Sequence, residues 1–376
     1  MILTASCIFG VEAVLSNEIK KLGYTVTKVD NGRVSFEGDL TAIARCNINL
    51  RTAGRVFISL KYFNASTFDQ LFDNINTISW GDYIHYNNKI NVKVSSLKSK
   101  LTSVPACQSI VKKSIVDKLL KKYASLPEDG DRVVVSVYIL DDAVSVFIDT
   151  TGESLHKRGY RIKNYEAPLS ETIAASLILL SYYNKGRILL DPFCGSGTIP
   201  IEAALIAKNI APGGNRKFDS SLFSFMNKKI WDKAYEEAYD MENDYHEQLI
   251  FGSDISSEAV DMAKFHAKRA NVESLIDFRT KAVKDLKKTD EYGIIICNPP
   301  YGERMLDQES AKELYLEIKN SFNQFDSWSK YIYTAYSDFE YVYGNKADKR
   351  RKIFNGKINC TYYQFFGPKP LTSHSV

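Results

Sequence analysis

Apolar and polar positions alternate in short runs over the first 60 residues of this 376-residue chain. Runs with a period of two predict strands at Leu3–Ile8, Val26–Val29 and Val34–Phe36. Val11–Leu22 has the spacing of an amphipathic helix that ends at Gly23, and Asn31-Gly32 is typical of a hairpin turn. The pattern predicts a small α+β unit.

Residues 61–165 carry a second mixture of predicted helix and strand. Pro105–Tyr123 has helical spacing and is rich in lysine, whereas Arg132–Leu140 and Ala143–Asp149 are strongly β-forming. The junction Leu140-Asp-Asp-Ala143 suits a hairpin turn. We expect a domain boundary in the polar stretch Thr150–Glu166, because no apolar pattern runs through it.

The second half of the chain alternates apolar runs with helical segments. Helices are predicted at Pro168–Tyr183, Ile199–Lys208 and Ser257–Ala270. Strands are predicted at Arg187–Leu190, Leu249–Ser253, Ile276–Thr280 and Gly293–Ile296. Such apolar runs between helices indicate an α/β fold with a doubly wound parallel sheet covered on both faces. Tyr331–Ala335 and the turn at Asn355-Gly356 predict an antiparallel hairpin at its edge.

The first motif with chemical meaning is Asp191-Pro-Phe-Cys-Gly-Ser-Gly-Thr198, which joins a predicted strand to a helix. Its two glycines allow a tight turn and the close approach of a ligand. The motif lacks the third glycine of a dinucleotide fingerprint and the Lys-Ser/Thr pair of a phosphate loop. Because Asp191 adds negative charge, the turn favours a ligand with an amino group or a positive charge. The alternative is a plain tight turn.

The second motif is Asn298-Pro-Pro-Tyr301, which follows the apolar run Gly293–Ile296. Two prolines stiffen the chain and remove two N–H donors. The Asn298 side-chain oxygen and the Pro299 carbonyl can therefore accept hydrogen bonds from one planar NH2 group, such as that of a nucleobase, while Tyr301 offers a ring for stacking. The alternative is a Pro-rich turn that ends a strand. Together the two motifs predict an S-adenosylmethionine-dependent amino methyltransferase.

Composition narrows the class of protein. Hydrophobic residues make up 44% and charged residues 25%, which excludes a largely disordered chain. The apolar runs are far shorter than the ~20 residues of a membrane span, and the first residues lack the pattern of a signal peptide. The six cysteines form no CxxC pair, so neither a disulfide framework nor a zinc site is indicated. We expect a cytoplasmic protein without membrane or metal.

The net charge of +4 conceals a local excess of cations. Residues 89–123 hold nine lysines and one acid, a local charge of +8, and lysines that contact phosphates make binding depend on salt. On the predicted helix we expect RNA contacts from Lys112, Lys113, Lys118, Lys121 and Lys122. Two further basic runs add Lys157, Arg158 and Arg161, and then Lys349 and Arg350. The alternative for such runs is a solvated surface.

The chain resembles the THUMP-domain ribosomal RNA (guanine-N2)-methyltransferases of the RlmL/YpsC-like group over nearly its full length. Besides the glycine-rich motif, the resemblance rests on Asn49-Leu-Arg-Thr-Ala-Gly-Arg-Val56, Asp149-Thr-Thr-Gly-Glu-Ser-Leu-His-Lys-Arg-Gly-Tyr-Arg161, Ala167-Pro-Leu-Ser-Glu-Thr172, Ala211-Pro-Gly-Gly-Asn-Arg216 and Asn298-Pro-Pro-Tyr-Gly-Glu-Arg304. It implies a ferredoxin-like unit (1–60), a THUMP RNA-binding domain (61–160) and a Rossmann-like methyltransferase domain (161–376) with a C-terminal antiparallel hairpin. It also implies S-adenosylmethionine as the cofactor.

The resemblance implies a role for each matching residue. The methionine end of the cofactor would contact Pro168, Glu171 and Thr172. Its amino-acid part would lie in the turn formed by Asp191, Pro192, Phe193, Gly195, Gly197 and Thr198. Asp254 and Ile255 would hold the ribose, although Asp254 has the alternative of capping the next helix. Asp285 is the candidate for the adenine amino group, since Ala282 stands where several relatives place the acid. The target base would lie at Asn298, Pro299, Pro300 and Tyr301.

The implied reaction is methyl transfer to the exocyclic N2 of a guanosine in 23S ribosomal RNA, free or in a precursor particle, by a monomer or weak dimer. The alternatives are a tRNA guanosine, a DNA adenine, or a non-catalytic RNA-binding assembly factor. Glu303 and Arg304 would hold the loop or contact the base or backbone. The insertion Asn209–Glu247 is expected near the site, because its core resembles the insertion of the family.

Overall fold

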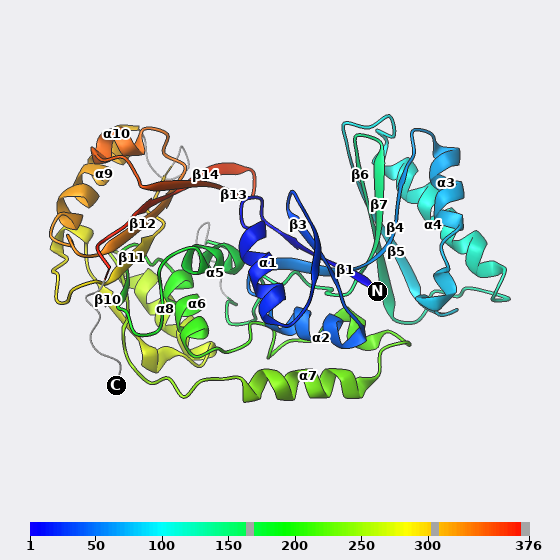
Figure 1. The fold of residues 1–376 in the computed structure, drawn as a ribbon, viewed down its shortest axis with the longest axis horizontal. Coiled ribbons are helices and arrows are strands. Elements are labelled where there is room, and N and C mark those ends of the chain that lie inside the picture. Colours follow the sequence, from blue (N-terminus) through cyan, green and yellow to red (C-terminus); the bar gives the residue numbers. More distant parts are fainter. Residues whose placement is uncertain (163–168, 302–307, 370–376) are drawn as a thin grey trace. The chain divides into compact units, whose positions relative to one another are not determined.

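The computed structural model describes residues 1–162, 169–301 and 308–369. The chain divides into two compact units. The first contains residues 1–7, 15–155 and 213–238, and the second contains residues 8–14, 156–212 and 239–376. Figure 1 shows the elements of both units along the chain.

The first unit is built on a seven-stranded sheet with the order β2-β3-β1-β4-β7-β6-β5. Its strands are β1 (Ile2–Cys7), β2 (Val26–Asp30), β3 (Arg33–Glu37), β4 (Ala53–Asn64), β5 (Lys89–Leu97), β6 (Arg132–Leu140) and β7 (Ala143–Asp149). The helices wholly or mostly in this unit are α1 (Glu12–Lys21), α2 (Leu40–Asn49), α3 (Phe68–Asn76), α4 (Val104–Leu120) and α7 (Lys228–Asp240), with 3-10 turns η1 (Trp80–Asp82) and η2 (Asp219–Leu222).

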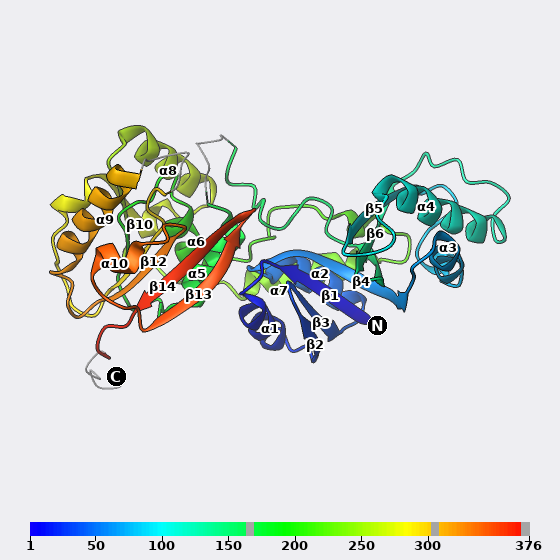
Figure 2. The same ribbon diagram turned by 90° about the horizontal axis from the view of Figure 1, so that it is seen from above.

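The long strand β4 holds the two halves of this sheet together. Its first part pairs with β1 as far as Ile58, and its second part pairs with β7 from Phe57 to Asn64. Figure 2 shows β4 between the β1–β3 group and the β5–β6 group. The predicted β6–β7 hairpin is present, and both turn residues, Asp141 and Asp142, have the positive φ that a type I′ turn requires (49° and 61°).

The second unit is built on another seven-stranded sheet, in the order β10-β9-β8-β11-β12-β14-β13. Its strands are β8 (Leu189–Asp191), β9 (Ile250–Asp254), β10 (Ile276–Thr280), β11 (Ile294–Cys297), β12 (Ser329–Thr334), β13 (Lys349–Asn355) and β14 (Ile358–Phe365). Its helices are α5 (Glu171–Leu179), α6 (Thr198–Ala207), α8 (Ser257–Arg269), α9 (Gln308–Phe322) and α10 (Phe339–Tyr343), with 3-10 turns η3 (Glu273–Leu275) and η4 (Val283–Asp285).

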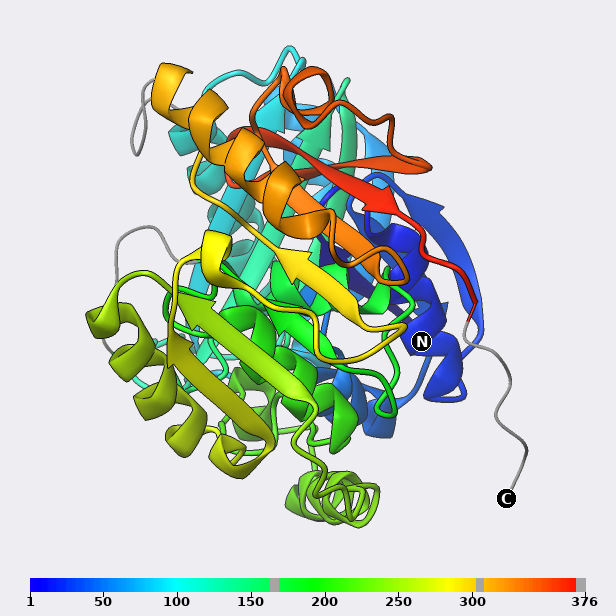
Figure 3. The ribbon, with the colours of Figure 1, turned by 90° about the vertical axis from the view of Figure 1, so that its left-hand side faces the viewer.

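The strands of the second unit run as the apolar pattern predicts. β10, β9, β8, β11 and β12 are parallel, and β14 and β13 complete the sheet as an antiparallel hairpin. Figure 3 views this sheet from the side of α9, with α5 and α6 behind it. The predicted α/β sheet with its C-terminal antiparallel hairpin is therefore confirmed.

The helix predicted at Pro168–Tyr183 is shorter than expected. The structure has α5 only from Glu171 to Leu179, and Pro168 lies outside the described residues. After α5 the Asn184 side chain accepts a hydrogen bond from the Gly186 N–H, and the Asn184 carbonyl accepts one from Arg187. This turn competes with continuation of the helix.

The central part of the aromatic insertion belongs to the first unit. The Gly213 N–H donates to the Ile48 carbonyl at 2.8 Å, and the rings of Phe218 and Trp231 stack at 5.3 Å. A side chain at Gly213 would meet the Asn47 and Ile48 backbone at 2.7–2.9 Å, so this close approach requires glycine. Residues 213–238 thus belong to the first unit, whereas the two ends of the insertion, 209–212 and 239–247, belong to the second.

Candidate functional site

Asp191 ends β8 and opens the glycine-rich turn. Asp191 is 1% exposed, and its carboxylate accepts a hydrogen bond from the Phe193 N–H at 3.1 Å. Burial raises the pKa of Asp191 well above its usual range, and the carboxylate of Asp254 raises it further. Within the described ranges no cation pairs with Asp191, so a ligand's positive group would find a counter-ion there.

The two glycines of the turn have different surroundings. Gly195 and Gly197 both have positive φ, 50° and 85°. A Cβ added at Gly195 would meet nothing within 4 Å, whereas one at Gly197 would lie 2.8 Å from the Cβ of Ala263. Gly195 therefore leaves open space over the turn, which a ligand can fill, and Gly197 allows α6 to approach α8 closely.

Asp254 lies at the end of β9 and contacts the same turn. One carboxylate oxygen accepts from the Gly195 N–H at 2.9 Å, and the other accepts from the Ser256 N–H at 3.0 Å. The N-cap of α8 is Ser256, whose hydroxyl accepts from the Ala259 N–H, so Asp254 is not the cap. Each oxygen keeps a lone pair for a further donor, while the adjacent Ile255 is 79% exposed.

A buried carboxyl group at the start of α5 is incompletely bonded. Glu171 is 3% exposed, and its Oε2 has no hydrogen-bond partner among the described residues. Its Oε1 lies 3.7 Å from Arg161 Nη1. Burial raises the pKa of Glu171, while Arg161 acts in the opposite direction. Beside it, Thr172 is buried and its hydroxyl contacts that of Ser170 at 3.0 Å.

The Asn298–Tyr301 segment follows β11 and presents acceptors that nothing in the described chain uses. Asn298 Oδ1 is buried without a partner, and no described residue donates to the Pro299 carbonyl. The neighbouring Pro300 carbonyl accepts from the Tyr315 hydroxyl at 3.4 Å. An unsatisfied buried acceptor costs about 1–3 kcal/mol, so a bound donor at Asn298 would be stabilising.

The Tyr301 ring is held from the antiparallel hairpin. Its hydroxyl oxygen accepts from Asn355 Nδ2 at 3.2 Å and from Cys360 Sγ at 3.4 Å. Burial raises the pKa of Tyr301, so the hydroxyl stays neutral. The motif carries no signal for Asn355 of β13 or Cys360 of β14, because the pairing of the antiparallel hairpin with β12 brings them close to Tyr301 from a distant part of the sequence.

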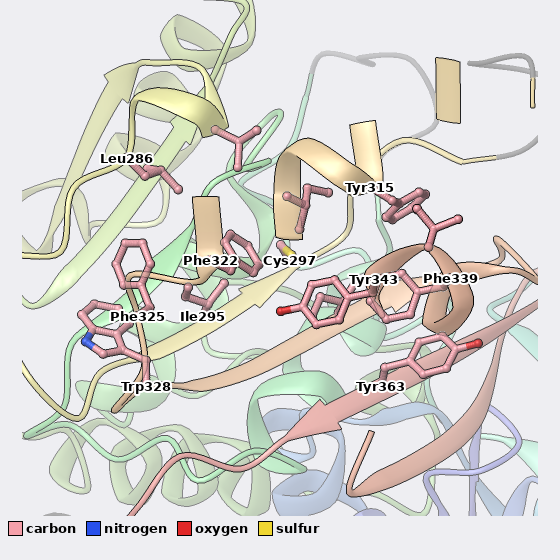
Figure 4. Close-up of a cluster of buried hydrophobic side chains, with 14 of the residues drawn as sticks. Leu286, Ile295, Cys297, Tyr315, Phe322, Phe325, Trp328, Phe339, Tyr343 and Tyr363 are labelled. Atoms are coloured by element: carbon pink, nitrogen blue, oxygen red, sulfur yellow. The ribbon is translucent and has the colours of Figure 1, made fainter. Parts of the chain in front are cut away.

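A large aromatic core supports the strand that carries this motif. Figure 4 shows Ile295 and Cys297 of β11 packed among ring side chains from α9, α10 and β14. The Tyr315 hydroxyl contacts that of Thr334 at 2.6 Å, and the Tyr315 and Tyr336 rings stack at 4.9 Å. This packing fixes the end of β11 and therefore the position of Asn298.

The sheet order brings the predicted motifs together. β9, β8 and β11 are neighbours and parallel, so Asp254, Asp191 and Asn298 follow the carboxyl ends of three adjacent strands. Ligands of open α/β sheets bind at this edge. Asp285 is different: it lies exposed in η4, after the edge strand β10. Glu303 and Arg304 lie outside the described residues.

The predicted lysine stripe on α4 is only partly available. Lys112 pairs with Glu128 at 2.9 Å, Lys121 lies 3.7 Å from Asp117, and Lys122 donates to the Gly81 carbonyl at 2.8 Å. Lys113 and Lys118 have no ion pair or side-chain hydrogen bond within the part of the chain that the structure describes. In the third basic run, Lys349 is exposed and Arg350 pairs with Glu340 at 2.8 Å.

Two of the arginines expected to contact RNA point into the protein. The Arg158 side chain is 2% exposed and its Nε lies 3.5 Å from the buried Glu202. Arg161, with its side chain 14% exposed, donates to the Thr198 hydroxyl at 2.7 Å and to the Leu169 carbonyl at 3.0 Å. Their positions do not match RNA contact, because these arginines neutralise buried carboxylates; Lys157 remains exposed.

No cluster of three or more His, Cys, Asp or Glu side chains is placed to hold a metal ion among the described residues. Nor does any described helix have the length and apolarity needed to cross a bilayer.

Three family models match the chain. The models described as RlmL ferredoxin-like domain and THUMP domain match residues 2–57 and 65–149. The model described as RMKL-like, methyltransferase domain matches residues 158–364, which is more than half of the chain.

Curated relatives match nearly the whole chain. YpsC of Bacillus subtilis (strain 168), provisionally named an RNA methyltransferase, is 44% identical over 368 residues, which cover 97% of this chain and 95% of YpsC. The ribosomal RNA large subunit methyltransferase K/L of Buchnera aphidicola is 30% identical over 377 residues, covering 96% of this chain and 54% of that protein. The chain thus spans about half the length of the K/L relatives that it matches.

Solved structures agree with these matches. SMU.472, provisionally named a methyltransferase and complexed with SAH, has a TM-score of 0.92, 38% identity and 98% coverage of both chains. A Listeria monocytogenes protein, provisionally named an N6-adenine-specific DNA methylase, has a TM-score of 0.92 and 46% identity, covering 98% of this chain and 96% of its own. With the sheet and the two motifs, these matches show that the chain belongs to the RlmK/L-like family of S-adenosylmethionine-dependent RNA methyltransferases.

Proposed function

We propose that this chain transfers the methyl group of S-adenosylmethionine to the exocyclic N2 of a guanosine in 23S ribosomal RNA. The observation that carries the proposal is the pair of unused acceptors after β11, Asn298 Oδ1 and the Pro299 carbonyl. An exocyclic amine presents two N–H donors in one plane, one for each acceptor. The name of the K/L relatives, ribosomal RNA large subunit methyltransferase, supports the choice of substrate.

The residues around the glycine-rich turn fit the cofactor. The open space over Gly195 admits its amino-acid part, and the buried carboxylates of Asp191 and Glu171 suit its ammonium group. Asp254 is placed to accept from the ribose hydroxyls. Bound S-adenosylmethionine supplies an electrophilic methyl group, so the chain has mainly to position the two reactants and exclude water.

At the amine, the chain acts through acceptors rather than through a base. Asn298 and Pro299 hold the two N–H bonds in place and turn the nitrogen lone pair toward the methyl group. The cofactor would supply the methyl group and keep the electron pair of its carbon–sulfur bond as the carbon–nitrogen bond forms. The amine proton, made acidic by the new bond, would pass to bulk solvent after the transfer. Tyr301 stacks against the base, which has to be extruded from structured RNA. Pro300 stiffens the segment.

We also propose that RNA binding and methyl transfer are carried out by different parts of the chain. Residues 1–60 and 61–160 hold RNA as the ferredoxin-like and THUMP parts, and residues 161–376 carry out transfer. Two cations without a partner in the described chain, the exposed Lys113 and the half-buried Lys118, support RNA contact by α4. Because ribosomal RNA is made and modified there, the proposed place of action is the cytoplasm.

The substrate is tested by offering labelled cofactor with 23S ribosomal RNA, tRNA and duplex DNA. Label in N2-methylguanosine of 23S RNA is expected. Label confined to tRNA would show that the substrate is a tRNA guanosine instead of 23S RNA. Label in adenine of DNA would favour the activity for which the Listeria relative is named. Label in none of the three pools would favour a non-catalytic RNA-binding factor.

The site is tested by Asn298→Ala. Loss of the acceptor should reduce methyl transfer at least about 100-fold, a few kcal/mol of transition-state stabilisation, while the affinity for SAH stays within about twofold. Loss of SAH binding as well would mean that Asn298 supports the fold instead. Unchanged transfer would refute the proposed role of Asn298.

A further inference from the structure

The first unit has a concave sheet face that its helices do not cover. On β1, Leu3 points toward α2, because a Cβ added at Gly38 would lie 2.9 Å from Leu3 and 2.7 Å from Ala42. Side chains alternate along a strand, so Thr4 lies on the opposite face. There its hydroxyl bonds to those of Ser35 at 2.9 Å and Ser59 at 2.8 Å.

The sheet bends around this face. Arg33 on β3 has its guanidinium carbon 4.0 Å from the centroid of the Tyr138 ring on β6, although β1, β4 and β7 lie between those strands in the sheet order. Such a contact requires the two ends of the sheet to curl toward each other. β4 allows this curl, because it leaves β1 after Ile58 and continues with β7, past a register shift at Ser59/Lys61.

A cavity of about 430 Å³ lies in the bend, and we call it the Arg33 groove. One wall comes from β1, β2 and β3, and the other from the ends of β4 and the start of β7. Its size is within the ~300–1,000 Å³ of small-ligand sites. The groove residues used below are Thr4, Lys28, Arg33, Ser35, Tyr62 and Asn64.

Arg33 carries a charge that the described chain leaves unpaired. It forms no ion pair and no side-chain hydrogen bond with any described residue. Burial lowers its pKa, while the charge of Asp30, opposite it in the β2–β3 hairpin, acts in the other direction. Its ring contacts, with Tyr138 at 4.0 Å and Phe147 at 5.4 Å, leave the N–H edges of the guanidinium without acceptors. The one acid that lines the groove, Asp30, is paired with Lys28 at 2.9 Å. The groove therefore favours an anion.

The groove also offers an aromatic surface. Tyr62 is 55% exposed, and its ring stands perpendicular to that of Phe147 at 5.9 Å, so about half of the Tyr62 side chain is open to a ligand. The amide of Asn64 adds a neutral donor and acceptor nearby, whereas the buried hydroxyls of Thr4 and Ser35 are bonded to each other. An arginine that can take a phosphate, beside a ring that can stack on a base, is the combination with which proteins bind unpaired nucleotides.

We propose that the Arg33 groove binds one nucleotide of an unpaired RNA segment, with Arg33 on the phosphate and Tyr62 against the base. The inference rests on the proposed function, because it takes RNA as the substrate. It adds a second point of attachment on the first unit, apart from α4. Stacking requires an unpaired base, so duplex RNA should not occupy the groove.

The test uses the full chain and a single-stranded oligoribonucleotide of about 12 nucleotides that carries iodouridine. Photo-cross-linking followed by peptide mass spectrometry should place the adduct at Tyr62 or Phe63. Arg33→Ala and Tyr62→Ala should each weaken binding of the oligonucleotide about tenfold or more. Arg33→Lys should recover only part of the loss, because lysine keeps the charge without the bidentate fork.

Matched controls come from α7. Lys229→Ala removes one exposed charge, and Tyr239→Ala removes a tyrosine that is 74% exposed; neither should change the affinity. If Arg33→Ala fails to fold, Tyr62→Ala still decides, because its side chain is mostly in solvent. Cross-links confined to other peptides, affinity unchanged in both groove variants, or equal cross-linking of duplex RNA would each overturn the proposal.

The two proposals fail separately. If the wild-type chain methylates RNA while both groove variants bind the oligonucleotide normally, only the groove proposal is wrong. If the oligonucleotide cross-links at Tyr62 while labelled cofactor leaves no methyl group on any RNA, the groove stands and the proposed function is wrong.

Discussion

The three glycines around the glycine-rich turn allow a sharp test, because each depends on glycine for a different reason. Gly195 has a positive φ and open space, Gly252 on β9 has space for no side chain, and Gly197 has both restrictions. A Cβ at Gly252 would lie 2.7 Å from the Phe278 ring, and one at Gly197 would lie 2.8 Å from Ala263 and 3.1 Å from Phe278.

The expected losses of stability follow from these distances. A left-handed alanine costs about 1–2 kcal/mol and recovers about 0.4–1 kcal/mol from the unfolded chain, so Gly195→Ala should lose about 1 kcal/mol. Overpacking costs about 1–3 kcal/mol, so Gly252→Ala should lose about 2 kcal/mol. Gly197→Ala combines both effects and should lose about 3 kcal/mol or more.

SAH binding should follow a different order. Gly195→Ala places a methyl group in the space over the turn, so it should weaken SAH more than Gly252→Ala does, although it costs less stability. Stability is measured by amide hydrogen exchange of peptides from β8, β9 and β11, because a chain of two units has no single unfolding free energy. SAH affinity is measured by calorimetry. If the loss of stability and the loss of SAH affinity rank the three variants in the same order, the cofactor does not occupy the open space at Gly195.

Three further outcomes are expected. Burial raises the pKa of Asp191 above its usual 3.8, so the folded chain favours the protonated form and stability falls as pH rises through the raised pKa. Asp191→Asn should therefore raise the melting temperature of the ligand-free chain at pH 8 and weaken SAH; a lower melting temperature would contradict this. Asn355→Ala removes a donor to the Tyr301 hydroxyl and should lower kcat several-fold with SAH affinity unchanged, whereas loss of SAH binding would indicate a general structural role. The double variant Lys113→Glu/Lys118→Glu should reduce the slope of log K for RNA binding against log salt concentration by about 1.5. An unchanged slope would mean that α4 is a solvated surface without RNA contacts.

Elements with a strong local signal were predictable, and those defined by distant partners were not. β6 and β7 have the predicted bounds, because runs rich in β-branched residues on either side of a two-residue turn define them locally. No turn residues mark the ends of β4 in this way. Its length follows from its partners, because its first part pairs with β1 and its second part with β7. The candidate site shows the same difference. The motif was enough to predict Asn298, whereas the hydrogen bond from Tyr315 to the Pro300 carbonyl depends on how α9 packs.

Basic runs in the sequence were the least reliable predictors of RNA-contacting residues, and the structure shows why. A basic run in the sequence states that cations are present but not which carboxylates will be buried beside them. Arg158 and Arg161 come from one of the basic runs, yet they compensate Glu202 and Glu171 inside the second unit. Arg33 stands in no basic run, yet its guanidinium forms no ion pair among the described residues, because its cross-strand neighbour Asp30 is paired with Lys28. A cation becomes available to RNA through the lack of an internal partner, so contacts with phosphate should follow unpaired charge rather than local charge density.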